Sequence, residues 1–323
     1  MIVTIITTLA PVFGIILLGF IIARKNVMPM TTATGLNQFV YWIAMPAMMF
    51  DILVHLDAGG FPDLLIPALA AALFCNWLLS AVLSIRVFRA SKAEAVILGC
   101  LANFPNGVFM GIAVVSFLLP GNNPALQVAG LCAFLYSMVI PVSDTILEML
   151  GHKGESLPRL AASLGKTVIR NPMIMAGALG IVLGLTGIAV PVWAGNMASM
   201  LGRTAAPCAL FAMGMVMNVQ LAAMGASPSS ARGRQAATHL LKLASMPCLT
   251  FLVLSLAGIH GIPLGVATLQ AAMPAGVVTY VIAEKHRTCV GESSIVIFVN
   301  TVASVATIPV VISLLFARGV FAL

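Results

Sequence analysis

Two apolar stretches of this sequence are interrupted by residues that end helices. Proline lacks a backbone N–H donor and clashes with the preceding turn, so each stretch should form two shorter helices. Backbone groups freed by such breaks are costly in lipid unless protein or water satisfies them. We therefore predict that two broken helices cross at the membrane midplane and hold a substrate there. The interruptions read Asn103-Phe104-Pro105-Asn106-Gly107 and Met273-Pro274-Ala275-Gly276.

The chemistry expected at this crossing is the binding of an anion. A half-helix that begins after Pro105 or Pro274 directs unpaired N–H groups and a positive dipole end into the crossing, which suits a carboxylate. Asn103 and Asn106 add amide donors, although both could serve only as caps of the broken backbone. Gln270 and Asn300 are weaker candidates, because amides in such spans often join helix to helix. The predicted substrate-binding residues here are Asn103, Pro105, Asn106, Gly107, Gln270, Pro274, Ala275, Gly276 and Asn300.

Arg203 is the charged residue with the most unusual position. It lies in the middle of another apolar stretch, one turn before Pro207. A charge at that depth costs about 3 kcal/mol or more, and should face a cavity or a partner. Since a guanidinium matches a carboxylate with two hydrogen bonds, we predict that Arg203 holds the second carboxylate of a dicarboxylate. The alternatives are a structural pair with a buried acid or carbonyl, and extension to a lipid headgroup.

Asp144 is the acid best placed to carry a coupling proton. It follows Pro141 by three residues within an apolar stretch. The alternative is an acid at a helix end that pairs with linker basic residues such as Lys153. Two other charged residues are expected near water: Lys242, which should extend to the membrane surface, and Glu292, which lies near the end of a span. No grouping of residues predicts a metal site.

The composition is that of a polytopic membrane protein. Hydrophobic residues make up 61% of the 323 positions and charged residues 8%, against about 25% charged residues in soluble domains. The mean hydropathy is +1.10. We expect a single membrane domain over residues 1–323. The net charge of +7 is spread over short loops, which indicates contact with anionic lipid and no nucleic-acid partner.

Ten membrane spans are predicted, and the basic residues orient them. Every second loop carries Lys or Arg, and the loops between these carry none. Because basic loops stay in the cytoplasm, both termini are predicted to lie outside. The predicted spans are residues 2–23, 36–56, 63–87, 93–119, 125–150, 169–188, 192–218, 236–258, 262–284 and 293–317.

The prolines suggest that the ten spans are a 5+5 repeat. Pro46, Pro105 and Pro141 each match a proline of the second half at a nearly constant offset, namely Pro207, Pro274 and Pro309. Five spans is an odd number, so the second half would enter the membrane with opposite polarity. Such inverted repeats are typical of secondary transporters with discontinuous helices at a midplane site. The predicted repeats are residues 1–151 and 167–323, with the broken helices in spans 4 and 9.

Several phrases resemble the auxin efflux carrier family, whose bacterial members include malonate and malate permeases. The resemblance covers nearly all ten spans in order. The phrases begin at Asn103 (Asn-Phe-Pro-Asn-Gly-Val-Phe-Met-Gly), Arg170 (Arg-Asn-Pro-Met-Ile), Ala206 (Ala-Pro-Cys-Ala-Leu-Phe-Ala-Met-Gly), Met273 (Met-Pro-Ala-Gly-Val) and Glu292 (Glu-Ser-Ser-Ile-Val-Ile-Phe-Val-Asn).

The resemblance implies a fold like that of the bile-acid sodium symporters. Spans 1, 2, 6 and 7 would form a scaffold, and spans 3–5 and 8–10 a moving transport domain. Alternating access of the elevator type would carry a small organic anion, best a dicarboxylate such as malonate or malate, across the bacterial cytoplasmic (inner) membrane. The expected partners are the anion, membrane lipid and a second copy bound through the scaffold spans. The glycines of span 6 are expected to serve close packing: Gly177, Gly180, Gly184 and Gly187.

Three alternatives stay open for the function. No cofactor is expected, and the expected coupling ion is a proton. The first alternative is a sodium-coupled symporter, because backbone carbonyls at a broken helix could bind sodium. An efflux carrier for auxin-like monocarboxylates is the second alternative. An intramembrane enzyme and a channel are disfavoured. The sequence has no nucleophile and histidine pair at matching depth, no His-Glu-x-x-His pattern and no rings of charge.

Overall fold

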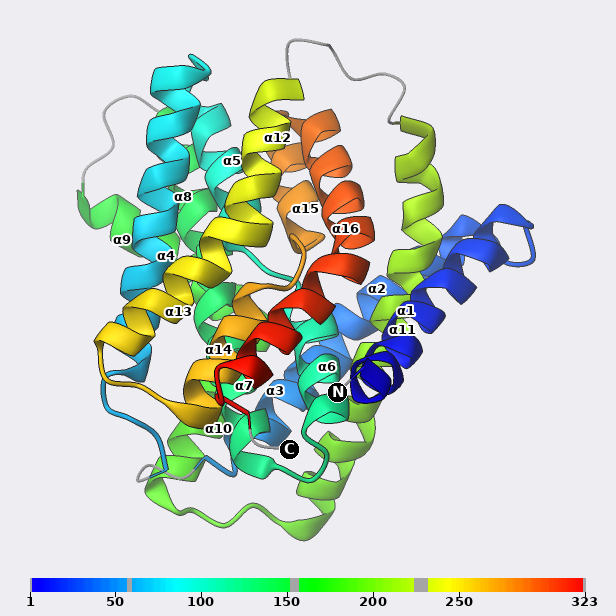
Figure 1. Cartoon of the computed structure of the whole chain (residues 1–323), viewed down its shortest axis with the longest axis vertical. Coiled ribbons are helices and arrows are strands. Elements are labelled where there is room, and N and C mark those ends of the chain that lie inside the picture. The colour runs from blue at the N-terminus through cyan, green and yellow to red at the C-terminus, as the bar shows by residue number, and fades with distance from the viewer. Residues whose placement is uncertain (1, 57–59, 152–156, 224–231, 322–323) are drawn as a thin grey trace. The chain divides into compact units, whose positions relative to one another are not determined.

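The computed structural model describes residues 2–56, 60–151, 157–223 and 232–321. Within these ranges every regular element is a helix, and the single β-type contact is an isolated bridge between Pro105 and Ala275. The prediction of an all-α protein is therefore confirmed. Figure 1 shows the course of the chain and the helix labels used below.

The chain divides into two compact units. Unit 1 comprises residues 1–63, 107–134 and 169–219, and unit 2 comprises residues 64–106, 135–168 and 220–323. The helices of unit 1, with π-helical turns written η, are α1 (Ile2–Arg24), α2 (Met30–Phe39), η1 (Val40–Ala44), α3 (Met45–Leu53), η3 (Gly107–Gly111), α6 (Ile112–Leu118), α10 (Pro172–Thr186) and most of α7 (Asn123–Ser137) and α11 (Val192–Ala223).

Unit 1 is held together by close helix contacts at glycines. A Cβ atom at Gly214 of α11 would collide with the carbonyl oxygen of Ile16 in α1, and one at Gly19 of α1 with the carbonyl oxygen of Phe211 in α11. The two backbones therefore touch directly, as small residues allow in membrane helices.

Helix α10 packs against α3 in the same way. Asn171 caps its start, because the Asn171 side-chain oxygen accepts hydrogen bonds from the N–H groups of Met173 and Ile174 at 3.1 and 3.3 Å. Gly180 and Gly184 face the α3 backbone. A Cβ atom placed at either glycine would lie less than 3.4 Å from backbone atoms of residues 50–54. Gly180 and Gly184 thus serve packing, as predicted, and the partner is α3 of the same chain. Gly187 differs, because it ends the helix with φ 67° and a Cβ placed there meets nothing within 4 Å.

Unit 2 contains the remaining helices. Figure 1 draws the link between α14 and α15 as a non-helical trace. The helices of unit 2 are α4 (Leu65–Val82), η2 (Leu83–Val87), α5 (Lys92–Asn103), α8 (Val139–Gly151), most of α9 (Leu157–Arg170), α12 (Arg232–Leu240), η6 (Leu241–Ser245), α13 (Met246–Leu256), α14 (Gly261–Ala271), α15 (Val278–Lys285) and α16 (Val290–Ala317).

Helix α5 is central to unit 2. It begins with a capping box, in which the Glu94 N–H donates to the Ser91 hydroxyl at 3.2 Å and the Ser91 N–H donates to the Glu94 carboxylate at 2.8 Å. All its residues from Ala95 to Asn103 are buried, and α4, α8 and α15 pack around it. The helix therefore brings its last residue, Asn103, into the interior of the unit.

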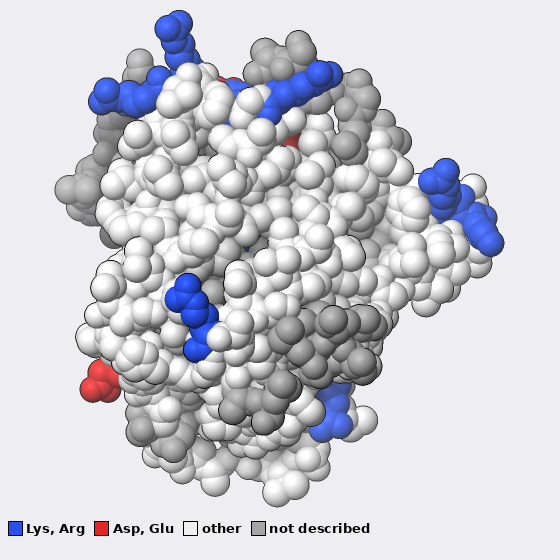
Figure 2. All heavy atoms as spheres, in the orientation of Figure 1, with Lys and Arg blue, Asp and Glu red and all other residues white. Residues whose placement is uncertain are grey.

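Five helices of the described residues are long and apolar enough to cross a membrane, or six if the bent pair Leu164–Arg170 and Pro172–Thr186 counts as one span. Shorter apolar helices cover Leu9–Arg24, Gly107–Leu118 and Gly261–Ala271. The last two are halves of the predicted spans 4 and 9, which are too short once broken. On the face drawn in Figure 2, uncharged residues cover most of the surface. An integral membrane protein is therefore supported, while the ten spans, the inverted repeat and the orientation of the termini stay predictions.

The two units can be compared with the expected scaffold and transport domains. All four predicted scaffold spans belong to unit 1. Residues 107–134, which were assigned to the transport domain, also group with unit 1, and the other predicted transport segments belong to unit 2. The division of labour between a fixed scaffold and a moving domain stays a prediction.

Candidate functional site

The two predicted helix breaks are both present. Helix α5 ends at Asn103 and the next helical turn begins at Gly107. Helix α14 ends at Ala271, and α15 begins at Val278. In each case the proline stands in the gap, where its missing N–H removes no helical hydrogen bond.

The two gaps pair with each other, and we call residues 104–106 and 274–276 the crossing. They form an antiparallel bridge centred on Pro105 and Ala275. The hydrogen bonds run from the N–H of Asn106 to the carbonyl of Pro274 at 2.7 Å and from the N–H of Gly276 to the carbonyl of Phe104 at 2.9 Å. The prediction that two interrupted segments meet is thus confirmed for this part of unit 2.

The crossing uses two of the backbone N–H groups that follow the prolines. We expected unpaired N–H groups after both prolines, but those of Asn106 and Gly276 are used within the crossing. The reason is that both segments are buried, so each supplies the partner that the other cannot find in water. Any ligand contact at these two residues must come from other atoms than their backbone N–H.

Gly276 allows the crossing to be this close. A Cβ atom at position 276 would lie 2.5 Å from ring atoms of Phe104 and 3.3 Å from the carbonyl oxygen of Pro105. A larger residue would push the two segments apart.

Asn103 is the centre of a buried network of polar side chains. Its amide donates to the carbonyl of Gly99 at 2.8 Å, and its side-chain oxygen accepts from the amide of Asn76 in α4 at 3.2 Å. The Asn76 amide also donates to the carbonyl of Ala102 at 3.2 Å, and the Ser245 hydroxyl donates to the Asn76 oxygen at 2.8 Å. Asn103 therefore caps the broken end of its own helix, and Asn76 fixes its orientation.

Lys242 lies beside the crossing, fully buried in η6. Its ammonium donates to the carbonyl oxygen of Ala271, the last residue of α14, at 2.7 Å. This carbonyl belongs to the negative end of the α14 dipole, which attracts a cation. The expectation that Lys242 extends to the membrane surface is therefore wrong, and its side-chain nitrogen lies next to the broken helix.

Asn300 and Gln270 are both completely buried in unit 2. The Asn300 side-chain oxygen lies 2.7 Å from Nδ1 of His239. Its amide nitrogen has no hydrogen-bond partner among the residues that the structure describes. The two N–H donors of the Asn300 amide are therefore open to a ligand or a water molecule.

The proton-carrier candidate Asp144 is engaged in an ion-pair cluster. The ammonium of Lys285 donates to its two carboxylate oxygens at 2.8 and 2.7 Å and to Glu148 at 3.1 Å, and Nε2 of His286 lies 2.7 Å from Asp144. Partial burial would lower the pKa of Lys285, but its hydrogen bonds to Asp144 and Glu148 outweigh this, and the pKa is raised. The partners come from the end of α15. Lys153, the suggested partner, lies outside the described residues.

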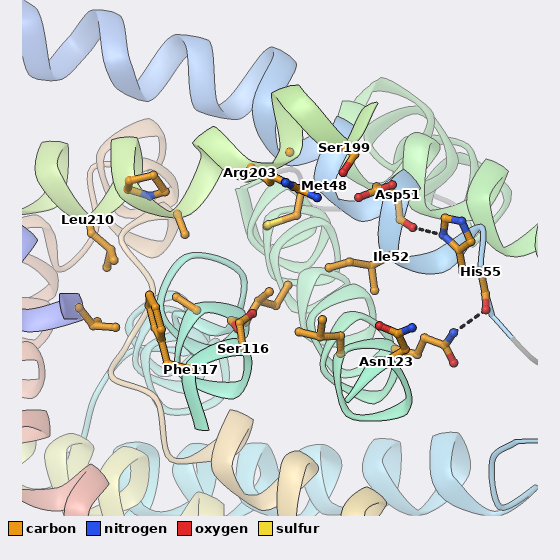
Figure 3. A pocket seen from close by; sticks show the side chains of 18 of the residues that line it. Met48, Asp51, Ile52, His55, Ser116, Phe117, Asn123, Ser199, Arg203 and Leu210 are labelled. Atoms are coloured by element: carbon orange, nitrogen blue, oxygen red, sulfur yellow. Dashed lines mark hydrogen bonds between the residues drawn. The ribbon is translucent and has the colours of Figure 1, made fainter. Parts of the chain in front are cut away.

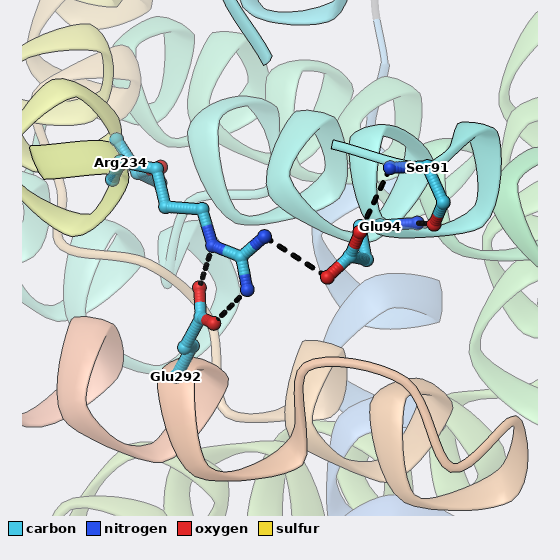
Figure 4. A network of polar contacts seen from close by, with 5 residues as sticks. Ser91, Glu94, Arg234 and Glu292 are labelled. Atoms are coloured by element: carbon cyan, nitrogen blue, oxygen red, sulfur yellow. Dashed lines mark hydrogen bonds and ion pairs between the residues drawn. The ribbon is translucent and has the colours of Figure 1, made fainter. Parts of the chain in front are cut away.

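Arg234 joins three helices of unit 2 (Figure 4). Its guanidinium binds both carboxylate oxygens of Glu292 in α16 and also donates to Glu94 of α5 at 2.9 Å. Glu292 is therefore largely buried and paired, which corrects the expectation that it is solvated.

Arg203 lies in unit 1, on the wall of a cavity of about 760 Å³ whose lining residues all belong to that unit (Figure 3). It makes no hydrogen bond or ion pair with any other residue of the described ranges. The prediction that Arg203 faces a cavity is confirmed. Except for Gly107 and Arg203, all the predicted substrate-binding residues belong to unit 2.

The sequence also held an overlooked signal for the polar residues around the crossing. His239, Lys242 and Ser245 recur at every third position of one apolar span, which places them on one helix face. In the structure each of them reaches a buried polar partner.

Comparison with known proteins gives a consistent result. The family described as "Membrane transport protein" matches residues 4–312. A protein of Rhizobium meliloti (strain 1021) named "Putative malonate transporter" is 26% identical over 302 residues, which is 92% of each chain. An uncharacterized transporter of Methanothermobacter thermautotrophicus is 23% identical over 94% of this chain and 95% of that protein. An uncharacterized transporter of Escherichia coli (strain K12) is 23% identical over 93% of this chain and 94% of that protein.

Proposed function

Because the chain belongs to the membrane transport protein family, which is that of the auxin efflux carriers, we propose that it is a secondary transporter of a small organic anion. The best candidate substrate is a dicarboxylate such as malonate. The proposed mechanism is alternating access of the elevator type, in a bacterial inner membrane, with unit 1 supplying the scaffold and a contact to a second copy.

The crossing is the observation that carries this proposal. Discontinuous helices with polar residues at a buried meeting point are the usual form of a transporter's substrate site. Here the ammonium of Lys242 and the amides of Asn76 and Asn103 lie at the broken ends. Asn300 of the same unit adds buried amide N–H donors without a partner among the described residues. This set of donors, with a positive charge and no carboxylate among them, favours an anion.

Two observations favour a dicarboxylate over a monocarboxylate. The relative from Rhizobium meliloti is named "Putative malonate transporter". Arg203 offers an unpaired guanidinium in a cavity large enough for a small acid. In the proposed mechanism the guanidinium of Arg203 binds one carboxylate of the substrate in the cavity of unit 1.

Proton coupling is proposed over sodium coupling. The sodium alternative depends on free carbonyls at a broken helix, and the carbonyl at the end of α14 already accepts from the Lys242 ammonium. Malonate uptake measured at fixed pH with and without sodium separates the two. A requirement for sodium would favour the symporter alternative.

Replacement of Arg203 tests the proposed function. In proteoliposomes, Arg203→Gln is expected to lower malonate counterflow by about ten- to a hundredfold, because charge-assisted hydrogen bonds contribute about 1.5–3 kcal/mol. The matched control is Arg170→Gln, which removes an exposed arginine of unit 1 that does not line the cavity. Equal counterflow in both variants would remove Arg203 from the site, and no counterflow of malonate, malate, succinate, lactate or indole acids by the wild type would contradict the function.

Replacement of the asparagines tests the crossing itself. Asn103→Ala and Asn106→Ala are each expected to raise the apparent KM for the anion about tenfold, the equivalent of one lost hydrogen bond of about 1.4 kcal/mol. The measurement is initial uptake rate against substrate concentration at matched protein density. If neither variant changes the kinetics, the crossing is only a structural joint.

A further inference from the structure

The cavity of unit 1 holds an acid as well as a base. Asp51 of α3 lines it together with Arg203 of α11. Figure 3 shows both side chains in the same part of the cavity wall, with Ser199 close to them. The feature was not apparent in the sequence, where the two residues belong to different predicted spans.

These two opposite charges do not pair with each other. No carboxylate oxygen of Asp51 lies within 4.0 Å of an Arg203 nitrogen, and neither side chain has another charged or hydrogen-bonding partner among the described residues. The Asp51 backbone carbonyl is used, 2.7 Å from Nδ1 of His55, but its carboxylate is not. The cavity therefore presents one unpaired cation and one unpaired anion.

We propose that this cavity takes its ligand as a monoanion that carries a hydrogen-bond donor: a carboxylate on Arg203 and the donor on Asp51. This inference depends on the proposed function. For a dicarboxylic acid the donor is the second carboxyl group in its protonated form, so malonate is bound as hydrogen malonate.

The electrostatics explain why the fully ionised acid is a poor ligand. Two carboxylates that share a site repel each other, and one of them then keeps a proton. A ligand with its second carboxylate near Asp51 meets this repulsion, whereas a protonated carboxyl group donates a hydrogen bond to the Asp51 oxygen. The proton stays on the substrate during binding and passes to water when the released acid ionises. One proton would thus accompany each substrate anion without a titrating carrier residue.

Few other charged groups face Asp51. Among the residues that line the cavity, the titratable or permanently charged ones are Asp51 of α3, His55 in the turn that follows α3, and Arg203 of α11. The lining residues from α1, α6 and α7 are apolar or neutral. A second cavity of about 540 Å³ also borders Asp51 and His55, and its other lining residues carry no charge.

Two malonate analogues test the proposal on the wild-type protein. Malonamate is a monoanion whose amide can donate a hydrogen bond, and monomethyl malonate is a monoanion of similar size whose ester can only accept. With equal pH inside and outside the proteoliposomes, malonamate is expected to compete with labelled malonate at least tenfold more strongly than monomethyl malonate does. Malonate counterflow itself should fall as the pH rises and the hydrogen malonate fraction shrinks.

The variant Asp51→Asn tests the role of the carboxylate. In this variant the factor by which malonate counterflow falls from low to high pH is expected to be at least fivefold smaller than in the wild type. The reason is that an amide does not repel the malonate dianion and can donate a hydrogen bond to it. Asp51→Glu, which keeps the charge, should retain the wild-type pH profile. Asp63→Asn is the matched control, because Asp63 is an exposed acid of unit 1 that does not line the cavity, and it should behave as the wild type.

The outcomes distinguish this inference from the proposed function. Equal competition by the two analogues, or a pH profile unchanged in a folded Asp51→Asn protein, overturns the inference while malonate transport stands. Since the analogue comparison needs no variant, misfolding of Asp51→Asn leaves the test intact. Absence of counterflow with every acid tested contradicts the proposed function, and the inference falls with it.

Discussion

Gly214→Ala is expected to prevent unit 1 from folding stably. The added Cβ would collide with the carbonyl oxygen of Ile16 and lie 2.9 Å from the Ile16 carbonyl carbon and from the Phe20 nitrogen. All of these are backbone atoms of α1, so no rotamer change can relieve the overlap, and the two helices must separate. Overpacking of this kind costs about 3 kcal/mol or more, which is a large part of the usual stability of 5–15 kcal/mol.

The same helix supplies the control. Gly195 also lies in α11, but a Cβ placed there meets nothing within 4 Å. Gly195→Ala is expected to be neutral or to stabilise by about 0.5–1 kcal/mol, because alanine loses less conformational freedom in a helix. Thermal unfolding and size-exclusion profiles in detergent check both variants. A Gly214→Ala protein as stable as Gly195→Ala would show that α1 and α11 are not in backbone contact.

Lys242→Met is expected to abolish most transport without loss of stability. The buried ammonium has one acceptor, the Ala271 carbonyl, and no carboxylate within 4.0 Å among the described residues. Burying such a charge costs several kcal/mol, more than the about 1–3 kcal/mol lost when the carbonyl is left without its donor. The fold alone would therefore be no worse with methionine, while an anion at the crossing would lose its nearest positive charge.

Unfolding temperature and malonate uptake, measured on the same preparation, test this expectation. Uptake should fall at least about tenfold, the equivalent of one charge-assisted hydrogen bond, and the unfolding temperature should stay at or above the wild-type value. Lys92→Met, which replaces an exposed lysine at the start of α5, is the control for removal of a charge from unit 2. Normal uptake combined with a lower unfolding temperature would assign Lys242 a purely structural role.

The helix breaks could be predicted from the sequence because their cause is local. A proline followed within two residues by glycine ends a helix wherever it stands, and lipid then demands a partner for the freed backbone. This argument located both interruptions and their contact. It could not tell which N–H groups the contact would use, because that depends on the register of two segments about 170 positions apart.

The surroundings of the crossing were harder to predict. Lys242 looks like a lysine that reaches the membrane surface, since nothing near it in sequence supplies an acceptor. Its acceptor is a carbonyl 29 positions away, which is free only because α14 ends there. The π-helical turn η6 adds to the difficulty, because it shifts the faces of the helix relative to a regular period of 3.6 residues.

The charged partners of Asp144 and the neighbour of Arg203 were missed for a similar reason. Lys285 and His286 lie more than 140 positions from Asp144, and Asp51 is one of several acids that stand near predicted span ends. Burial cost showed that Arg203 needs a cavity. It gave no information on which other side chain would share it.

The reciprocal hydrogen bonds of the crossing also restrict the permeation route. A solute that passed between residues 104–106 and 274–276 would have to break both bonds and leave two N–H and two carbonyl groups dry, at several kcal/mol for each group. Each transport cycle would then include the free-energy cost of breaking these bonds, which a solute that passes beside the two segments does not incur. This cost opposes a continuous pore through the junction and favours a solute path beside it.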